Sequence, residues 1–220
     1  MARGQAVQGM QAVHGLLFLG LMLVVALVPP IAHWPFATLV PVVVYTAVVL
    51  SFPSLRRSVS WLRVGRLDRG IVVATAITIM ASSSALVLWY MAVRPDLGRF
   101  VSRIPPGGVL QLALIGLLFA CVNAALEEAA WRGVVMDALA ARIGASGAVF
   151  VQALGFGAGH LAGIPGGAVG IGMASLFGLA LGLLRQRAQG ILPCYIAHVC
   201  ADATIYGLVV FSACSTLVRM

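Results

Sequence analysis

A small group of ionisable side chains lies inside strongly apolar segments of this sequence. An ionisable group at the centre of a membrane helix costs roughly 2.5–3.5 kcal/mol on insertion scales, so it is rare without a partner or a function. Carboxylates and imidazoles are also the groups that most often transfer protons in catalysis. We therefore expect acid–base chemistry within a membrane from the five residues of this group: Glu127, Glu128, His160, His198 and Asp202.

The spacing of the two glutamates separates their roles. Glu128 and Arg132 are four residues apart, so they share a helix face and can form an ion pair that offsets most of the cost of burial. Glu127 points about 100° away, towards Asn123 and Trp131, and it has no cation in its own helix. A carboxylate in this position is suited to act as a general base. The alternative interpretation is that both glutamates only hold helices together.

Helix packing can bring the two histidines to the depth of Glu127. His198 and Asp202 are four residues apart, so imidazole and carboxyl lie on one helix face. If the chain turns near residue 143, Glu127 and His160 each lie about 16 or 17 residues from the turn, or roughly 25 Å along each helix. The spacing predicts that they meet across an antiparallel hairpin.

Three short motifs around these residues resemble those of a family of intramembrane proteases. Residues 127–132 (EEAAWR) resemble the EExxxR motif of the CAAX-protease and bacteriocin-processing family, also called the CPBP or Abi family. Residues 156–160 (FGAGH) and 198–202 (HVCAD) resemble its FxxxH and HxxxN/D motifs, in the family's order. The resemblance covers residues 120–205. It implies an intramembrane glutamic endopeptidase without a metal or other cofactor, which hydrolyses a peptide bond of a membrane-associated protein or peptide.

The resemblance also implies roles for single residues. Glu127 and His160 would activate the attacking water, and His198 and Asp202 would lie near the oxyanion. Members that process prenylated proteins carry asparagine where this chain has Asp202. An ionised carboxylate repels an oxyanion, so we expect Asp202 to act in its protonated form or to orient His198. Supporting roles are expected for Glu128, Arg132, Asn123, Phe156 and Trp131.

Three other kinds of chemistry are compatible with the same buried groups. A zinc-dependent intramembrane metalloprotease could use two carboxylates and two histidines as ligands, although the chain has no HExxH motif. A non-proteolytic transporter or immunity protein could use them as a proton relay, although the chain shows no internal repeat. A cysteine or serine nucleophile is disfavoured, because Cys200 projects away from His198 and Ser175 has no base near it in the sequence.

The composition of the chain indicates the fold class. The 220 residues are 61% hydrophobic and only 9% charged, which excludes a soluble globule. The apolar stretches run without alternation, which excludes an outer-membrane barrel. We predict an all-α polytopic transmembrane bundle of about seven spans, near residues 13–28, 34–52, 70–93, 109–141, 148–161, 167–184 and 191–210.

The spans divide into two parts. Residues 1–105 would form N-terminal transmembrane helices with about three spans, and residues 106–220 a catalytic core with about four. The fourth span is too long for one perpendicular crossing, so it should tilt, bend or leave the bilayer, and residues 144–147 should turn the chain. Glycine pairs at 155/159, 166/170 and 178/182 indicate close helix packing. His14 and His33 fall near predicted helix ends, and we expect them at the membrane interface.

The arginines predict the orientation. If the loop at residues 53–69 is cytoplasmic, nine of the fourteen arginines lie on cytoplasmic segments and four on external ones, and Arg132 lies within a helix. We therefore predict an integral protein of the bacterial inner membrane with a cytoplasmic N-terminus. Because the net charge of +8 comes mostly from predicted cytoplasmic loops, nucleic acid is not an expected partner. The apolar helices imply the lipid bilayer as a partner, and the family resemblance implies a membrane-associated protein or peptide substrate.

Overall fold

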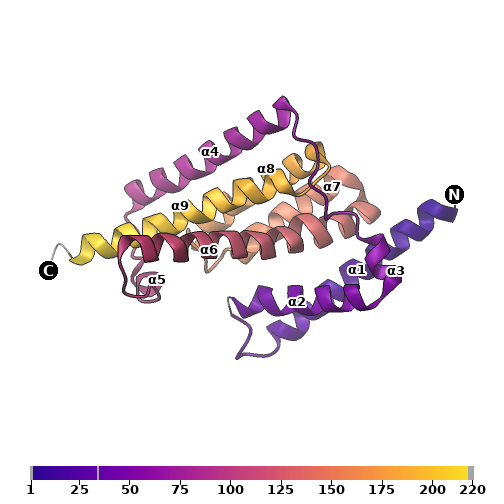
Figure 1. The fold of residues 1–220 in the computed structure, drawn as a ribbon, viewed down its shortest axis with the longest axis horizontal. Helices are drawn as coiled ribbons and strands as arrows, with labels where there is room; N and C mark the ends of the chain where they lie inside the picture. Colours follow the sequence, from indigo (N-terminus) through magenta and orange to yellow (C-terminus); the bar gives the residue numbers. More distant parts are fainter. Residues whose placement is uncertain (1, 34, 218–220) are drawn as a thin grey trace.

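The chain folds into helices joined by short loops (Figure 1). The computed structural model describes residues 2–33 and 35–217, and all the regular elements in these ranges are helical. In chain order the elements are α1 (Ala2–Ala26), α2 (Phe36–Ser51), α3 (Pro53–Ser58), α4 (Arg69–Val93), α5 (Gly98–Val101), α6 (Val109–Glu128), the π-helix η1 (Ala129–Val135), α7 (Met136–Gly159), α8 (Gly167–Ala188) and α9 (Leu192–Leu217).

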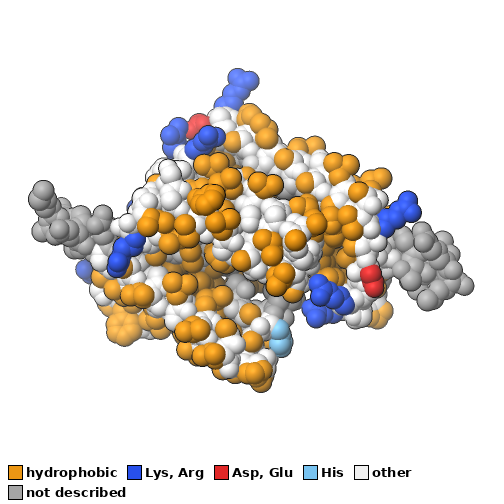
Figure 2. Space-filling view, turned by 180° about the vertical axis from the view of Figure 1, so that it is seen from behind, with side chains coloured by type: hydrophobic (Ala, Val, Ile, Leu, Met, Phe, Trp, Pro, Cys, Tyr) orange, Lys and Arg blue, Asp and Glu red, His pale blue; other side chains and the backbone are white. Residues whose placement is uncertain are grey.

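The apolar surface of these helices identifies an integral membrane protein. Within the described ranges, five helical stretches are long and apolar enough to span a bilayer, and α2 is a shorter apolar helix of 16 residues. Large side chains on the outer face of α4, such as Met80 and Leu88, are 67% and 65% exposed. Figure 2 shows apolar side chains over much of one face and arginines towards its margins. Such an apolar surface needs lipid around it, and the predicted polytopic helical bundle is confirmed.

The longest apolar stretch, Val109–Gly159, is not one straight helix. Gly144 has φ 75° and ψ 167°, a left-handed backbone conformation that glycine adopts without steric cost. The predicted turn near residues 144–147 is therefore confirmed. After it the chain returns, so that Phe156 near the end of α7 contacts Trp131 and Arg132 of η1, as a hairpin requires. With this division, and with α2 included, the described residues form seven apolar helical segments.

The helices α4, α6 and α8 are arranged around α9. In Figure 1, α9 runs between α4 and α6, and it packs against both. The pair α7 and α8 packs closely, and α8 also contacts α4 and α9. On the other side of the molecule, α1 and α2 pack against η1, which therefore lies between the N-terminal helices and the rest of the bundle.

Glycines allow the close contact between α7 and α8. A Cβ atom on Gly178 would lie 3.2 Å from the α7 backbone, and one on Gly182 would lie 2.6 Å from an α7 side chain. The close packing predicted for this pair is confirmed. Of the pair predicted in α7, Gly155 meets an aromatic ring at 2.8 Å, whereas Gly159 meets nothing within 4 Å because it ends the helix beside open space. The four-residue pattern therefore identified only part of the α7 surface.

A buried polar cluster joins the N-terminal helices to α7. His14 is only 2% exposed, and its ring nitrogens contact the hydroxyls of Tyr45 at 2.7 Å and Ser58 at 2.8 Å. Nearby, the hydroxyl of Ser60 donates to the carboxylate of Asp137 in α7. His14 is thus buried within the protein, because segments distant in the sequence fold over α1 and supply its partners. Its depth relative to the membrane interface stays a prediction.

The arginine-rich loop before α4 lies against the turn between α8 and α9. The backbone N–H of Arg66 donates to Ala188 at 2.7 Å, and that of Ile191 donates to Arg63 at 2.8 Å. Asp68 caps α4: the backbone N–H of Ile71 and the Arg66 side chain hold the pKa of this carboxyl below its ordinary value. Two of the arginine-bearing segments predicted to be cytoplasmic thus lie at the same end of the molecule.

Candidate functional site

Glu128 lies at the centre of a buried network of charges. Its side chain is 1% exposed, and Oε1 accepts hydrogen bonds from Arg132 Nη1 at 2.8 Å and from His198 Nδ1 at 2.7 Å. The predicted pair of Glu128 and Arg132 is confirmed. The structure adds His198 of α9 as a second partner, which the sequence spacing did not predict. Because an ionised carboxylate only accepts, His198 carries a proton on Nδ1.

The π-helix η1 follows the two glutamates directly. It buries Arg132 completely and places its guanidinium carbon 4.2 Å from the centre of the Phe156 ring, a cation–π contact. Gly133 makes room for Trp61, whose ring would lie 2.6 Å from a Cβ atom at this position. Short π-helical segments are rare and frequently occur at functional sites. Apolar periodicity does not distinguish this wider turn from an α-helix, so the sequence did not predict it.

Glu127 shares a face of α6 with Asn123, as the spacing predicts, and it also approaches His198. Asn123 Nδ2 donates to Glu127 Oε1 at 3.3 Å and to Asp202 Oδ2 at 3.1 Å. Glu127 Oε2 is buried, has no hydrogen-bond partner among the described residues, and lies 3.6 Å from His198 Nε2. The same nitrogen lies 3.8 Å from Asp202 Oδ1, so His198 and Asp202 share a helix face as predicted. Residues from α6 and α9 thus converge on His198 Nε2.

His160 is the residue directly after α7, and it lines the same cavity as His198 and Asp202 of α9. Its Nδ1 donates to the Phe156 carbonyl at 2.8 Å, which leaves Nε2 for other contacts. The Phe156 ring lies between the two histidines, with its centre 4.5 Å from that of His160 and 5.8 Å from that of His198. Phe156 also meets the Trp131 ring edge-on at 6.0 Å. This phenylalanine therefore packs together the side chains of all three sequence motifs.

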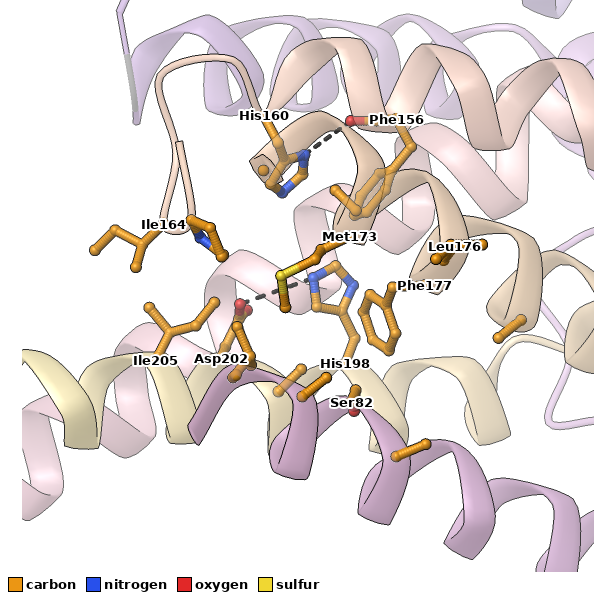
Figure 3. A pocket seen from close by; sticks show the side chains of 18 of the residues that line it. Ser82, Phe156, His160, Ile164, Met173, Leu176, Phe177, His198, Asp202 and Ile205 are labelled. Atoms are coloured by element: carbon orange, nitrogen blue, oxygen red, sulfur yellow. Dashed lines mark hydrogen bonds and ion pairs between the residues drawn. The ribbon is translucent and has the colours of Figure 1, made fainter. Parts of the chain in front are cut away.

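A cavity of about 300 Å³ opens beside these residues. Its lining comes from α4, α8, α9 and the segment around His160, and it is mainly apolar (Figure 3). Its ionisable lining residues are His160, His198 and Asp202. Glu127 does not line the cavity, but it contacts the lining residue His198. The cavity therefore brings a large apolar space next to the candidate catalytic groups.

The contribution of α4 to this cavity was not predicted. Thr78, Ala81, Ser82 and Ala85 line it, on successive turns of α4. Small residues that recur every three or four positions on an apolar helix are the signal that could have identified this face. The spacing alone could not show that the face meets a cavity instead of another helix.

The site carries more negative than positive charge. Counted in their ionised forms, the carboxylates of Glu127, Glu128 and Asp202 outnumber the two possible cations, Arg132 and a protonated His198. Among the described residues, no group of three or more His, Cys, Asp and Glu side chains has the geometry to hold a metal ion. Whether the reaction proceeds without a metal, as the resemblance implies, stays a prediction.

Comparison with known protein families places the three motifs in one matched segment. Residues 108–204 match the family described as type II CAAX prenyl endopeptidase Rce1-like. This segment is similar to the Rce1-like endopeptidases. The match confirms the family resemblance and supports a protease, a hydrolase of peptide bonds, in general terms. No curated protein and no solved structure gives a significant match.

The Rce1-like segment does not include the whole site. It begins at α6 and contains every candidate residue named above in α6, η1, α7 and α9. The helix α4, which forms one wall of the cavity, lies before the segment. Of the helices that precede the segment, α4 therefore contributes directly to the cavity.

Proposed function

We propose that this protein is an intramembrane endopeptidase that hydrolyses a peptide bond of a membrane-associated protein or peptide, using a water activated by glutamate and histidine. The observation that carries the proposal is the convergence of Glu127, His198 and Asp202 in the Rce1-like segment, beside the cavity that His160 lines. The helices that carry the site are long and apolar enough to span a bilayer, so a substrate embedded in or anchored to the membrane could reach it.

The proposed reaction begins at Glu127. Oε2, the oxygen without a hydrogen bond, takes a proton from water, and the water oxygen attacks the peptide carbonyl carbon. His160 Nε2 helps to hold and polarise this water. His198 donates from Nε2 to the oxygen that becomes negative. The C–N bond then breaks, and the leaving nitrogen takes the proton from Glu127, which regenerates the carboxylate.

Asp202 fits the orienting role better than a direct contact with the oxyanion. One of its oxygens accepts the Asn123 amide, and the other faces His198 Nε2 at 3.8 Å. A carboxylate in this position stabilises the protonated imidazole that donates to the oxyanion. Asp202 then acts through His198.

The decisive experiment is cleavage of a candidate peptide by the purified protein and by Glu127→Gln. The amide keeps the shape of the side chain and removes its basicity, so we expect kcat to fall by about 10²–10⁴-fold while substrate binding is retained. Asp68→Asn is the matched control, because it makes the same kind of change at an exposed cap outside the site.

Two results would contradict this assignment. Cleavage by Glu127→Gln at the wild-type rate would remove Glu127 as the base. Loss of cleavage on chelation, followed by recovery with zinc, would replace the proposed mechanism with that of a metalloprotease.

A further inference from the structure

Asn123 is a buried amide that joins two carboxylates on different helices. It is 8% exposed, lies in α6 one turn before Glu127, and donates to both Glu127 Oε1 and Asp202 Oδ2. A carboxamide nitrogen has two hydrogens, so it can serve both acceptors at once. Asn123 thus makes a direct polar link between α6 and α9 at the level of the candidate base.

This link gives the two oxygens of Glu127 different surroundings. Oε1 is engaged by Asn123, whereas Oε2 is buried without a hydrogen-bond partner and lies 3.6 Å from His198 Nε2. A carboxylate held by one oxygen cannot rotate freely, so the other oxygen keeps a defined direction. The geometry selects Oε2 as the atom that can accept a proton.

The link also counters the repulsion between two acids. Glu127 Oε2 and Asp202 Oδ1 lie 3.6 Å and 3.8 Å from the same nitrogen of His198, so the two carboxylates approach one another closely. Like charges in a poorly solvated site repel strongly. A neutral donor that binds both of them keeps them at the spacing His198 needs without adding a further ionisable group.

We propose that Asn123 is a positioning residue for the reaction: it presents Glu127 Oε2 to the attacking water and holds Asp202 against His198. This inference rests on the proposed function. Displacement of a catalytic group by about 1 Å can cost about 10²-fold in rate. Asn123→Ala should therefore lower kcat by about 10–10²-fold and leave KM almost unchanged, because Asn123 does not line the cavity.

A double substitution separates positioning from simple stabilisation. Asn123→Asp places a third acid beside the pair and should reduce both folding and activity. In the double variant Asn123→Asp/Asp202→Asn, the amide on α9 donates to the carboxylate on α6. The link between the two helices is then restored with donor and acceptor exchanged, so the melting temperature should recover. Glu127 then faces a carboxylate instead of an amide, and kcat should stay about tenfold or more below that of Asp202→Asn alone. This comparison also holds if Asn123→Ala fails to fold.

Gln152→Ala is the matched control for loss of a buried amide. Gln152 donates to two backbone carbonyls and touches none of the candidate catalytic groups, so its loss should lower the melting temperature without lowering kcat. A wild-type kcat in Asn123→Ala, or a double variant with the kcat of Asp202→Asn, would overturn the positioning role. Failure of the proposed function is distinguished by Glu127→Gln: wild-type cleavage in that variant refutes the endopeptidase mechanism itself.

Discussion

The buried pair of Arg132 and Glu128 gives the sharpest prediction for stability. Arg132→Met keeps most of the side-chain volume and removes the charge, so Glu128 remains buried with His198 as its remaining partner. Removal of one partner of a buried pair costs about 3–5 kcal/mol. For a chain of this length, 1 kcal/mol shifts Tm by about 2–4 °C. We therefore expect Arg132→Met to lower Tm by about 6–20 °C, towards the smaller value if His198 compensates.

Thermal melting of the purified protein measures this loss. Arg66→Met is the matched control, because Arg66 forms its ion pair with Asp68 at the surface, where the two side chains are 69% and 45% exposed. Such pairs contribute about 0–1 kcal/mol, so this variant should melt close to wild type. Adding Glu128→Gln to Arg132→Met removes the isolated charge while it keeps an acceptor for His198, and it should restore part of the lost Tm.

The result that would refute this reasoning is a small effect. If Arg132→Met melts no lower than Arg66→Met, the network does not carry the stability assigned to it. If Arg132→Met melts normally but does not cleave, Arg132 belongs to the chemistry and not to the structural support of Glu128.

Three further predictions concern the cavity, the helix packing and the orientation. Ala85→Phe should fill the cavity and lower kcat/KM for substrates with large apolar residues by about tenfold or more. Ser84→Phe, on the exposed side of α4, should leave kcat/KM unchanged. Equal kcat/KM values for the two variants, measured over a series of peptides, would contradict this prediction. In Gly157→Ala the new methyl group would press against Ser175 and the α8 backbone, so this variant should lose about 1–3 kcal/mol of unfolding free energy. In Gly159→Ala the methyl group meets open space, so the unfolding free energy should not fall by this amount. Equal unfolding free energies for the two variants would contradict the packing. Reporter fusions in the loop at residues 53–69 should report a cytoplasmic location, and an external signal would reverse the predicted orientation.

The helical membrane fold follows from local features of the sequence. Long apolar stretches are incompatible with water and must form helices in lipid, because the backbone can then satisfy its own hydrogen bonds. A glycine near residue 144 accounts for the turn, since its backbone conformation is one that other residues rarely adopt. The Glu128–Arg132 pair and the Asn123–Glu127 contact were predictable for the same reason: residues four apart on a helix are neighbours. The π-helix was not predictable, because it changes only the hydrogen-bond spacing of an apolar helix and depends on packing such as that of Trp61 on Gly133.

Contacts between helices required the tertiary structure. Spacing along the chain placed His198 and Asp202 on one face, but only the packing of α9 beside α6 brought His198 Nδ1 to Glu128 and Asp202 to Asn123. The burial of His14 and the cavity wall formed by α4 arise in the same way, from segments far apart in sequence. The sequence determined which residues are ionisable in an apolar environment and which neighbours they have within a helix. Tertiary packing decided which of them meet, because contacts between helices depend on side-chain fit and not on spacing along the chain.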